Sequence, residues 1–158
     1  MKEVLLLVGA GQIGMAIARR MGFGKKIIVG DKRPENAQAI TAILANAGFD
    51  AEAHKCDLSN RESIKALISV AQEHGPITML VNAAGVSPSQ APIEAILKVD
   101  LYGTAVLLEE AMVVSEMGAR LSPKAAWVLP FPASRASAWR SLPPKKMLSL
   151  PAPLPKNC

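Results

Sequence analysis

Several residue types are scarce in this sequence of 158 residues, and each scarcity excludes a class of protein. The only cysteines, Cys56 and Cys158, have no metal-binding spacing, which argues against a disulfide framework and a zinc site. No apolar run approaches the roughly 20 residues that a membrane span needs. Glu3 and the early glycines argue against a secretion signal. We therefore expect a cytoplasmic protein that uses neither a membrane nor a metal.

Acidic residues are missing from one part of the chain only. Residues 117–158 contain seven basic and no acidic residues, whereas residues 1–116 contain 11 basic and 13 acidic residues, a net charge of −2. The overall charge of +5 therefore describes the C-terminal tail alone. Because the rest of the chain is slightly acidic, we expect no nucleic-acid partner.

The tail is also rich in proline, with eight of the 12 prolines in residues 121–158. This density suits neither a helix nor a central strand. We divide the chain into a domain of residues 1–112 and a basic tail of residues 113–158. Two interpretations of the tail stay open: a disordered segment whose polyproline stretches bind a partner, or an out-of-frame translation. Codons for "PPKKML" and "LPKNC", read two bases later, allow acid-rich peptides instead.

Strand and helix patterns alternate along residues 1–112. Short apolar runs predict strands at 3–9, 26–31, 51–57 and 77–85. Helical spacing of apolar residues predicts helices at 12–22, 34–48 and 59–75, the last capped by Ser59 or Asn60, and one long helix at 91–112. This alternation implies parallel strands joined by right-handed crossovers. The predicted fold class is α/β, with a doubly wound parallel sheet of about four strands.

A glycine-rich loop, "GAGQIG", lies between the first predicted strand and helix. Gly9 permits a tight turn, Gly11 lets the backbone approach a pyrophosphate, and Gly14 lets helix and strand pack closely. Gln12 and Ile13 open the helix, whose N-terminus offers free N–H groups and a positive dipole end to phosphates. The loop therefore predicts a Rossmann-type site for a dinucleotide cofactor.

The end of the second predicted strand carries an acid followed by two bases. Asp31 can accept hydrogen bonds from ribose hydroxyls, and its charge would repel a 2′-phosphate, which favours NAD. Lys32 and Arg33 follow directly, and either side chain could fold over the ribose and admit NADP. We expect NAD, with NADP as the alternative.

Four features in this order resemble the short-chain dehydrogenase/reductase family over about residues 3–110. They are "GAGQIG", Asp31, "CDLS" at residues 56–59 and "VNAAG" at residues 81–85. Two details depart from the family's main branch: the glycine loop is one residue shorter, with Val8 in place of threonine, and Ala83 stands where asparagine is common. The resemblance implies hydride transfer between NAD(P) and a carbonyl or alcohol of a small-molecule substrate.

The resemblance also implies roles for residues of the last two motifs. Asp57 would hydrogen-bond the adenine amino group, and Leu58 would lie alongside the ring. Asn82, Ala83 and Gly85 would hold the end of the fourth strand and line the adenosine side of the cofactor.

The family's catalytic residues are poorly matched. Asp100 in "KVDLYGT" occupies the place of an asparagine that helps organise a proton relay in the family, so it is a candidate catalytic residue. Alternatively, it is a polar residue that satisfies the backbone of its own helix or a neighbour on that helix. The family also uses a Tyr-x-x-x-Lys pair, but the single tyrosine here, Tyr102, is followed four residues later by Val106.

The sequence therefore predicts a chain that holds the dinucleotide but lacks the catalytic half of the enzyme. The alternative is a non-catalytic module that binds a dinucleotide or interacts through its tail.

Overall fold

The computed structural model describes residues 2–87 and 89–116. In chain order the elements are β1 (Val4–Val8), α1 (Gln12–Met21), β2 (Lys26–Asp31), α2 (Pro34–Asn46), β3 (Asp50–Lys55), α3 (Arg61–His74), β4 (Ile77–Asn82), α4 (Ile93–Ile96), a π-helical segment η1 (Leu97–Gly103) and α5 (Thr104–Glu116). The four predicted strands and the first three predicted helices are confirmed. The rest of the predicted tail, from residue 117, lies outside the described residues.

The four strands form one parallel sheet in the order β3-β2-β1-β4. In the middle of the sheet, Leu6 of β1 pairs with Ile28 of β2 on one side and with Leu80 of β4 on the other. β1 is apolar on both faces, and each of its residues is at most 1% exposed. The change of direction between β1–β2–β3 and β1–β4 is that of a doubly wound sheet, so the predicted fold class is confirmed.

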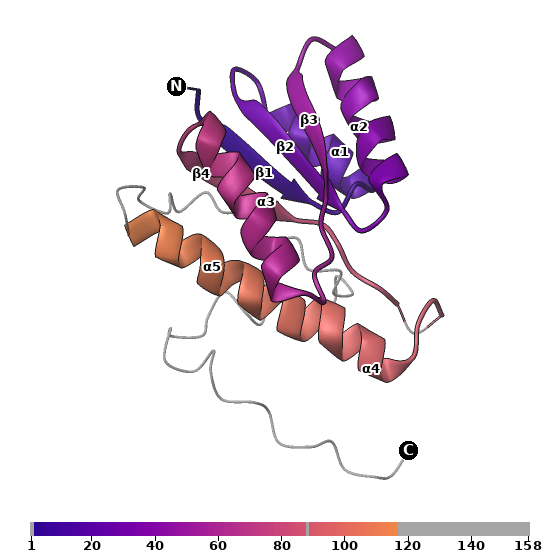
Figure 1. The fold of residues 1–158 in the computed structure, drawn as a ribbon. Coiled ribbons are helices and arrows are strands. Elements are labelled where there is room, and N and C mark those ends of the chain that lie inside the picture. Colours follow the sequence, from indigo (N-terminus) through magenta and orange to yellow (C-terminus); the bar gives the residue numbers. More distant parts are fainter. Residues whose placement is uncertain (1, 88, 117–158) are drawn as a thin grey trace, which may run out of the picture.

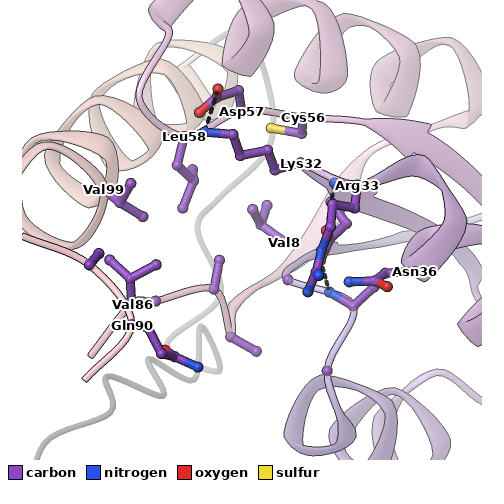
Figure 2. Close-up of a pocket in the computed structure, with 18 of the residues that line it drawn as sticks. Val8, Lys32, Arg33, Asn36, Cys56, Asp57, Leu58, Val86, Gln90 and Val99 are labelled. Atoms are coloured by element: carbon purple, nitrogen blue, oxygen red, sulfur yellow. Dashed lines mark hydrogen bonds and ion pairs between the residues drawn. The ribbon is translucent and has the colours of Figure 1, made fainter. Parts of the chain in front are cut away.

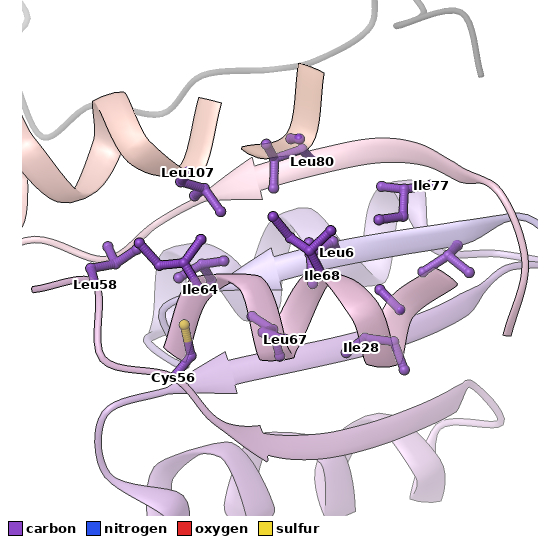
Figure 3. Close-up of a cluster of buried hydrophobic side chains, with 14 of the residues drawn as sticks. Leu6, Ile28, Cys56, Leu58, Ile64, Leu67, Ile68, Ile77, Leu80 and Leu107 are labelled. Atoms are coloured by element: carbon purple, nitrogen blue, oxygen red, sulfur yellow. The ribbon is translucent and has the colours of Figure 1, made fainter. Parts of the chain in front are cut away.

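Helices cover both faces of the sheet (Figure 1). On one face, Leu5 and Leu7 pack with buried residues of α1 and α2. On the other face, Leu6 packs with residues of α3 and α5, including Ile64 and Leu107 (Figure 3). Alternate residues of β1 therefore belong to different cores, which fixes the register of the central strand. Because all four strands are parallel, their carboxyl ends lie at the same edge of the sheet.

The helix predicted at 91–112 differs from the observed one. It begins at Ile93 after the N-cap Pro92, continues to Glu116, and contains the π-helical turn η1 between α4 and α5. Gly103, at the end of this turn, lies against the loop after β3: a Cβ there would lie 2.5 Å from the carbonyl oxygen of Leu58. The missing side chain lets the helix pack directly on that loop. π-Helical turns of this kind occur frequently near functional sites.

We expect Gly103→Ala to destabilise the protein by about 1–2 kcal/mol, because overlap with the Leu58 backbone exceeds the roughly 1 kcal/mol that alanine gains in a helix. Chemical denaturation measures the change in free energy of unfolding. Ala105→Gly, at an exposed position of α5, gives the helix preference alone. An unchanged or raised stability of Gly103→Ala would contradict this packing.

Candidate functional site

A cavity of about 780 Å³ lies at the carboxyl ends of the strands (Figure 2). In open α/β sheets ligands bind at this edge, where the strand order reverses. Predicted site residues that line it are Gly9, Gly11, Asp31, Lys32, Asp57, Leu58, Ala83 and Gly85. The remaining predicted residues, Gln12, Ile13, Gly14, Asn82 and Asp100, lie in elements next to the cavity but do not line it.

The three glycines of the loop differ in their surroundings. Gly9 has φ +97°, and a Cβ there would lie 2.3 Å from the backbone nitrogen of Ala84. A Cβ on Gly14 would lie 2.6 Å from the carbonyl oxygen of Gly9, so the helix packs directly on the loop. By contrast, a Cβ on Gly11 would meet nothing within 4 Å. Gly9 and Gly14 are therefore required by packing, whereas the space at Gly11 is open.

The N-terminus of α1 is available to an anion. Gly11 is the N-cap and provides no side-chain cap, and the first turn contains no acidic residue. Gln12 and Ile13 open the helix with exposed side chains. Since the first N–H groups of a helix have no partner within it, this end presents donors and a positive dipole end.

Asp31, at the end of β2, is held by two loops. Its Oδ2 accepts a hydrogen bond from the backbone nitrogen of Ala10 at 2.8 Å, and its Oδ1 accepts one from that of Arg33 at 2.8 Å. The carboxylate is thus fixed beside the glycine loop. Because each carboxylate oxygen has more than one acceptor position, both can accept a further hydrogen bond from a ligand.

Asp57, after β3, forms an ion pair across the cavity rim. Its Oδ2 lies 3.3 Å from Lys32 Nζ, and its Oδ1 accepts hydrogen bonds from the backbone and hydroxyl of Ser59. Burial by itself would raise the pKa of Asp57, but the hydrogen bonds from Ser59 and the pairing with Lys32 together lower it. Asp57 is therefore charged at neutral pH and can accept a hydrogen bond from a ligand.

Asn82 ends β4 and is 2% exposed. Its Nδ2 donates to Thr104 Oγ1 at 3.0 Å, and its Oδ1 accepts from the backbone nitrogen of Ala84 at 3.2 Å. Ala83 and Gly85 follow and line the cavity. Asn82 thus acts on the loop backbone rather than on the cavity itself.

Asp100 lies in η1, and its Oδ1 accepts a hydrogen bond from the backbone nitrogen of Val86 at 3.0 Å. The carboxylate thus satisfies a backbone group of the loop after β4. Tyr102 is 45% exposed and does not line the cavity. The structure therefore brings neither side chain into the cavity.

The sequence motifs did not identify several residues that line the cavity: Asn36, Val86, Gln90, Ala91, Ala95 and Val99. Most belong to the loop after β4 and the helix that follows. The one sequence signal for them was that they follow the carboxyl end of a predicted strand. Cys56 also lines the cavity, but burial raises its pKa to about 11. Its thiol is therefore protonated and unreactive at neutral pH.

The two histidines lie away from the cavity, on either side of Glu52. Its Oε1 is 2.9 Å from Nε2 of His54, and its Oε2 is 3.3 Å from Nε2 of His74. Within residues 2–87 and 89–116, no group of three side chains is arranged to hold a metal ion. Across the same residues, no helix is both long and apolar enough to cross a membrane.

The glycine geometry gives a test of folding. We expect Gly9→Ala to destabilise the protein by more than about 3 kcal/mol, because it adds backbone strain to an overlap with Ala84. Gly11→Ala should cost no more than about 1 kcal/mol, the preference for glycine over alanine at an N-cap, since Gly11 has an extended backbone and open space. Thermal and chemical unfolding of both variants measure this. Equal effects would show that the loop packs differently.

The parallel sheet, the open glycine loop and the acid at the end of β2 define a Rossmann-type dinucleotide fold. Residues 3–119 match the family model for short chain dehydrogenases. The chain therefore belongs to the short-chain dehydrogenase/reductase family, as the four sequence motifs predicted.

Individual relatives are also named as dehydrogenases or oxidoreductases. A short-chain dehydrogenase/reductase, bsc3, from Alternaria brassicicola is 35% identical over 109 residues, which cover 69% of this chain and 40% of that protein. An uncharacterized oxidoreductase, YxjF, from Bacillus subtilis is 40% identical over 96 residues, which cover 59% of this chain and 37% of that protein. The chain thus spans less than half the length of these relatives.

Solved structures show the same fold. Actinorhodin polyketide ketoreductase with NADPH superposes with a TM-score of 0.65 at 28% identity, over 73% of this chain and 48% of that one. A metagenomic short-chain oxidoreductase in complex with NADP superposes with a TM-score of 0.63 at 32% identity, over 72% of this chain and 56% of that one. These relatives bind the phosphorylated dinucleotide.

Proposed function

We propose that this chain binds NAD(P) in the cavity at the carboxyl ends of the strands, as the cofactor-binding part of an oxidoreductase. The observation that carries the proposal is the uncapped N-terminus of α1, with open space at Gly11 beside the cavity. The cavity volume of about 780 Å³ is in the range of cofactor sites.

The residues present fit the parts of a dinucleotide. The pyrophosphate would bind the first N–H groups of α1, which the lack of a side chain at Gly11 leaves accessible. Asp31 would accept hydrogen bonds from the adenosine ribose hydroxyls. Asp57 would accept one from the adenine amino group, with Leu58 against the ring.

We propose NAD as the preferred form. The Asp31 carboxylate would repel a 2′-phosphate, and Lys32, one of the two basic side chains that could offset that charge, is paired with Asp57. The NADPH and NADP in the two structural relatives support NADP as the alternative. To neutralise the additional phosphate, Lys32 would have to leave Asp57 or Arg33, which also lines the cavity, would have to turn toward the ribose.

A bound nicotinamide supplies or accepts a hydride, and the whole protein would exchange it with a carbonyl or alcohol of a small molecule. The residues that line the cavity would bind and orient the cofactor. The only tyrosine, Tyr102, lies outside the cavity and has no lysine four residues later. We therefore propose that the 158-residue chain by itself binds the dinucleotide without turnover.

Binding is tested by titrating the purified chain with NADH and NADPH and following cofactor fluorescence. We expect saturable binding, and a Kd raised at least about 10-fold by Gly11→Ala, because its Cβ would occupy the space of the pyrophosphate. The melting temperature of the free variant should fall by no more than a few degrees, because the change affects only the N-cap of α1. Binding to neither dinucleotide, or an unchanged Kd in Gly11→Ala, would refute the proposed site.

The choice of cofactor is tested with Asp31→Asn, which keeps an acceptor oxygen but removes the charge. We expect the ratio of the Kd for NADPH to the Kd for NADH to fall by about 10-fold, since repulsion between two charges a few ångströms apart near a protein surface is worth roughly 1–2 kcal/mol. Glu35→Gln, on the exposed first turn of α2, serves as a charge-matched control. An unchanged ratio would remove Asp31 as the basis of NAD preference.

A further inference from the structure

We propose that Thr104 is a positioning residue of the dinucleotide site, although its side chain does not line the cavity. The inference rests on the proposed binding of NAD(P). Thr104 begins α5, directly after the π-helical turn, and its hydroxyl oxygen accepts a hydrogen bond from Asn82 Nδ2 at 3.0 Å.

The hydroxyl fixes which way the Asn82 amide points. With Nδ2 donating to Thr104, Oδ1 faces the opposite direction and accepts from the backbone nitrogen of Ala84 at 3.2 Å. An Asn amide has a donor group and an acceptor oxygen that turn together, so loss of the partner of one group frees the whole amide to rotate. Thr104 therefore determines the hydrogen bond that holds Ala84.

Ala84 lies directly against the glycine loop. The space that a Cβ on Gly9 would need is taken up by Ala84 N, at 2.3 Å, and by the carbonyl carbon of Ala83, at 2.5 Å. A second bond holds the same loops together, from the backbone nitrogen of Ala83 to the carbonyl oxygen of Val8 at 2.7 Å. A shift of Ala84 must therefore move the glycine loop or open the contact between them.

The burial of Asn82 makes the loss of its hydrogen bond to Thr104 costly. The side chain is 2% exposed, so an Nδ2 group without an acceptor could not be satisfied by bulk water. Removing the Thr104 hydroxyl would leave that donor unpaired or make the amide rotate, and either result disturbs Ala84. The effect reaches the pyrophosphate position through residues 82–84 and the glycine loop, without a contact between Thr104 and the cofactor.

A matched control exists in α2. Thr41 is 8% exposed, and its hydroxyl donates to the carbonyl oxygens of Ala37 and Gln38, both at 3.0 Å, within its own helix. Thr41→Val and Thr104→Val remove the same group from a helix, at a buried position for Thr41 and a half-buried one for Thr104. Only the Thr104 hydroxyl is connected to the cavity wall, and Thr104→Ser retains it.

The test combines three measurements on the 158-residue wild-type chain, Thr104→Val, Thr104→Ser and Thr41→Val: melting temperature, Kd for NADH, and amide hydrogen exchange of residues 83–85. We expect Thr104→Val to raise the Kd by about 5- to 10-fold, the size expected from one unpaired buried donor, and to accelerate exchange at Ala84. Thr104→Ser should match the wild type, and Thr41→Val should change the melting temperature alone.

Two results would decide against the proposal. If Thr104→Val changed the melting temperature but neither the Kd nor the exchange, its role would be structural only, like that of Thr41. If the wild type bound neither NADH nor NADPH, the proposed function would fail, and the exchange at Ala84 would still decide whether Thr104 positions the loop: wild-type exchange in Thr104→Val would overturn it.

Discussion

The site depends on a close contact between two backbone segments, the glycine loop after β1 and the small-residue loop after β4. No side chain fits between Gly9 and Ala84, where a Cβ would lie 2.3 Å from the amide nitrogen. This contact brings the uncapped N-terminus of α1 to the edge of the sheet where β1 and β4 end. The cavity forms there because β1 lies between strands whose crossovers run in opposite directions.

The long helix after β4 connects the two sides of this cavity. Near its centre, Asp100 binds the Val86 backbone, Gly103 packs on Leu58, and Thr104 binds Asn82. Leu58 and Val86 both line the cavity. These residues lie in or directly after the π-helical turn η1. The same helix packs against α3 and the sheet further along, so it also sets the positions of the loops after β3 and β4. The core and the site are thereby built from the same segment.

The sequence predicted much of this arrangement because its signals are local. Spacing of apolar residues located the strands and the first three helices, and Asn60, one of two expected caps, accepts hydrogen bonds from the first turn of α3. The glycine spacing located the loop between β1 and α1. The π-helical turn could not be predicted, since it depends on how residues 97–103 pack against distant loops rather than on their periodicity.

The same limit applied to the site. The motifs named Asp31, Asp57 and Asn82, but the pairing of Asp57 with Lys32 and the bond from Asn82 to Thr104 join residues that are 25 and 22 positions apart. Such contacts follow from the topology of the sheet and carry no local signal. Asp100 illustrates the consequence: no local pattern indicates that its carboxylate holds the Val86 backbone, 14 positions away.

The most direct measurement of the central claim is a map of backbone amide chemical shifts of the ¹⁵N-labelled chain during titration with NAD. The account predicts that the largest changes fall on the amides of Gly11, Gln12 and Ile13, with further changes around Asp31 and residues 83–85. Changes confined to other surfaces, or none at saturating NAD and NADP, would contradict the claim that this edge of the sheet is a dinucleotide site.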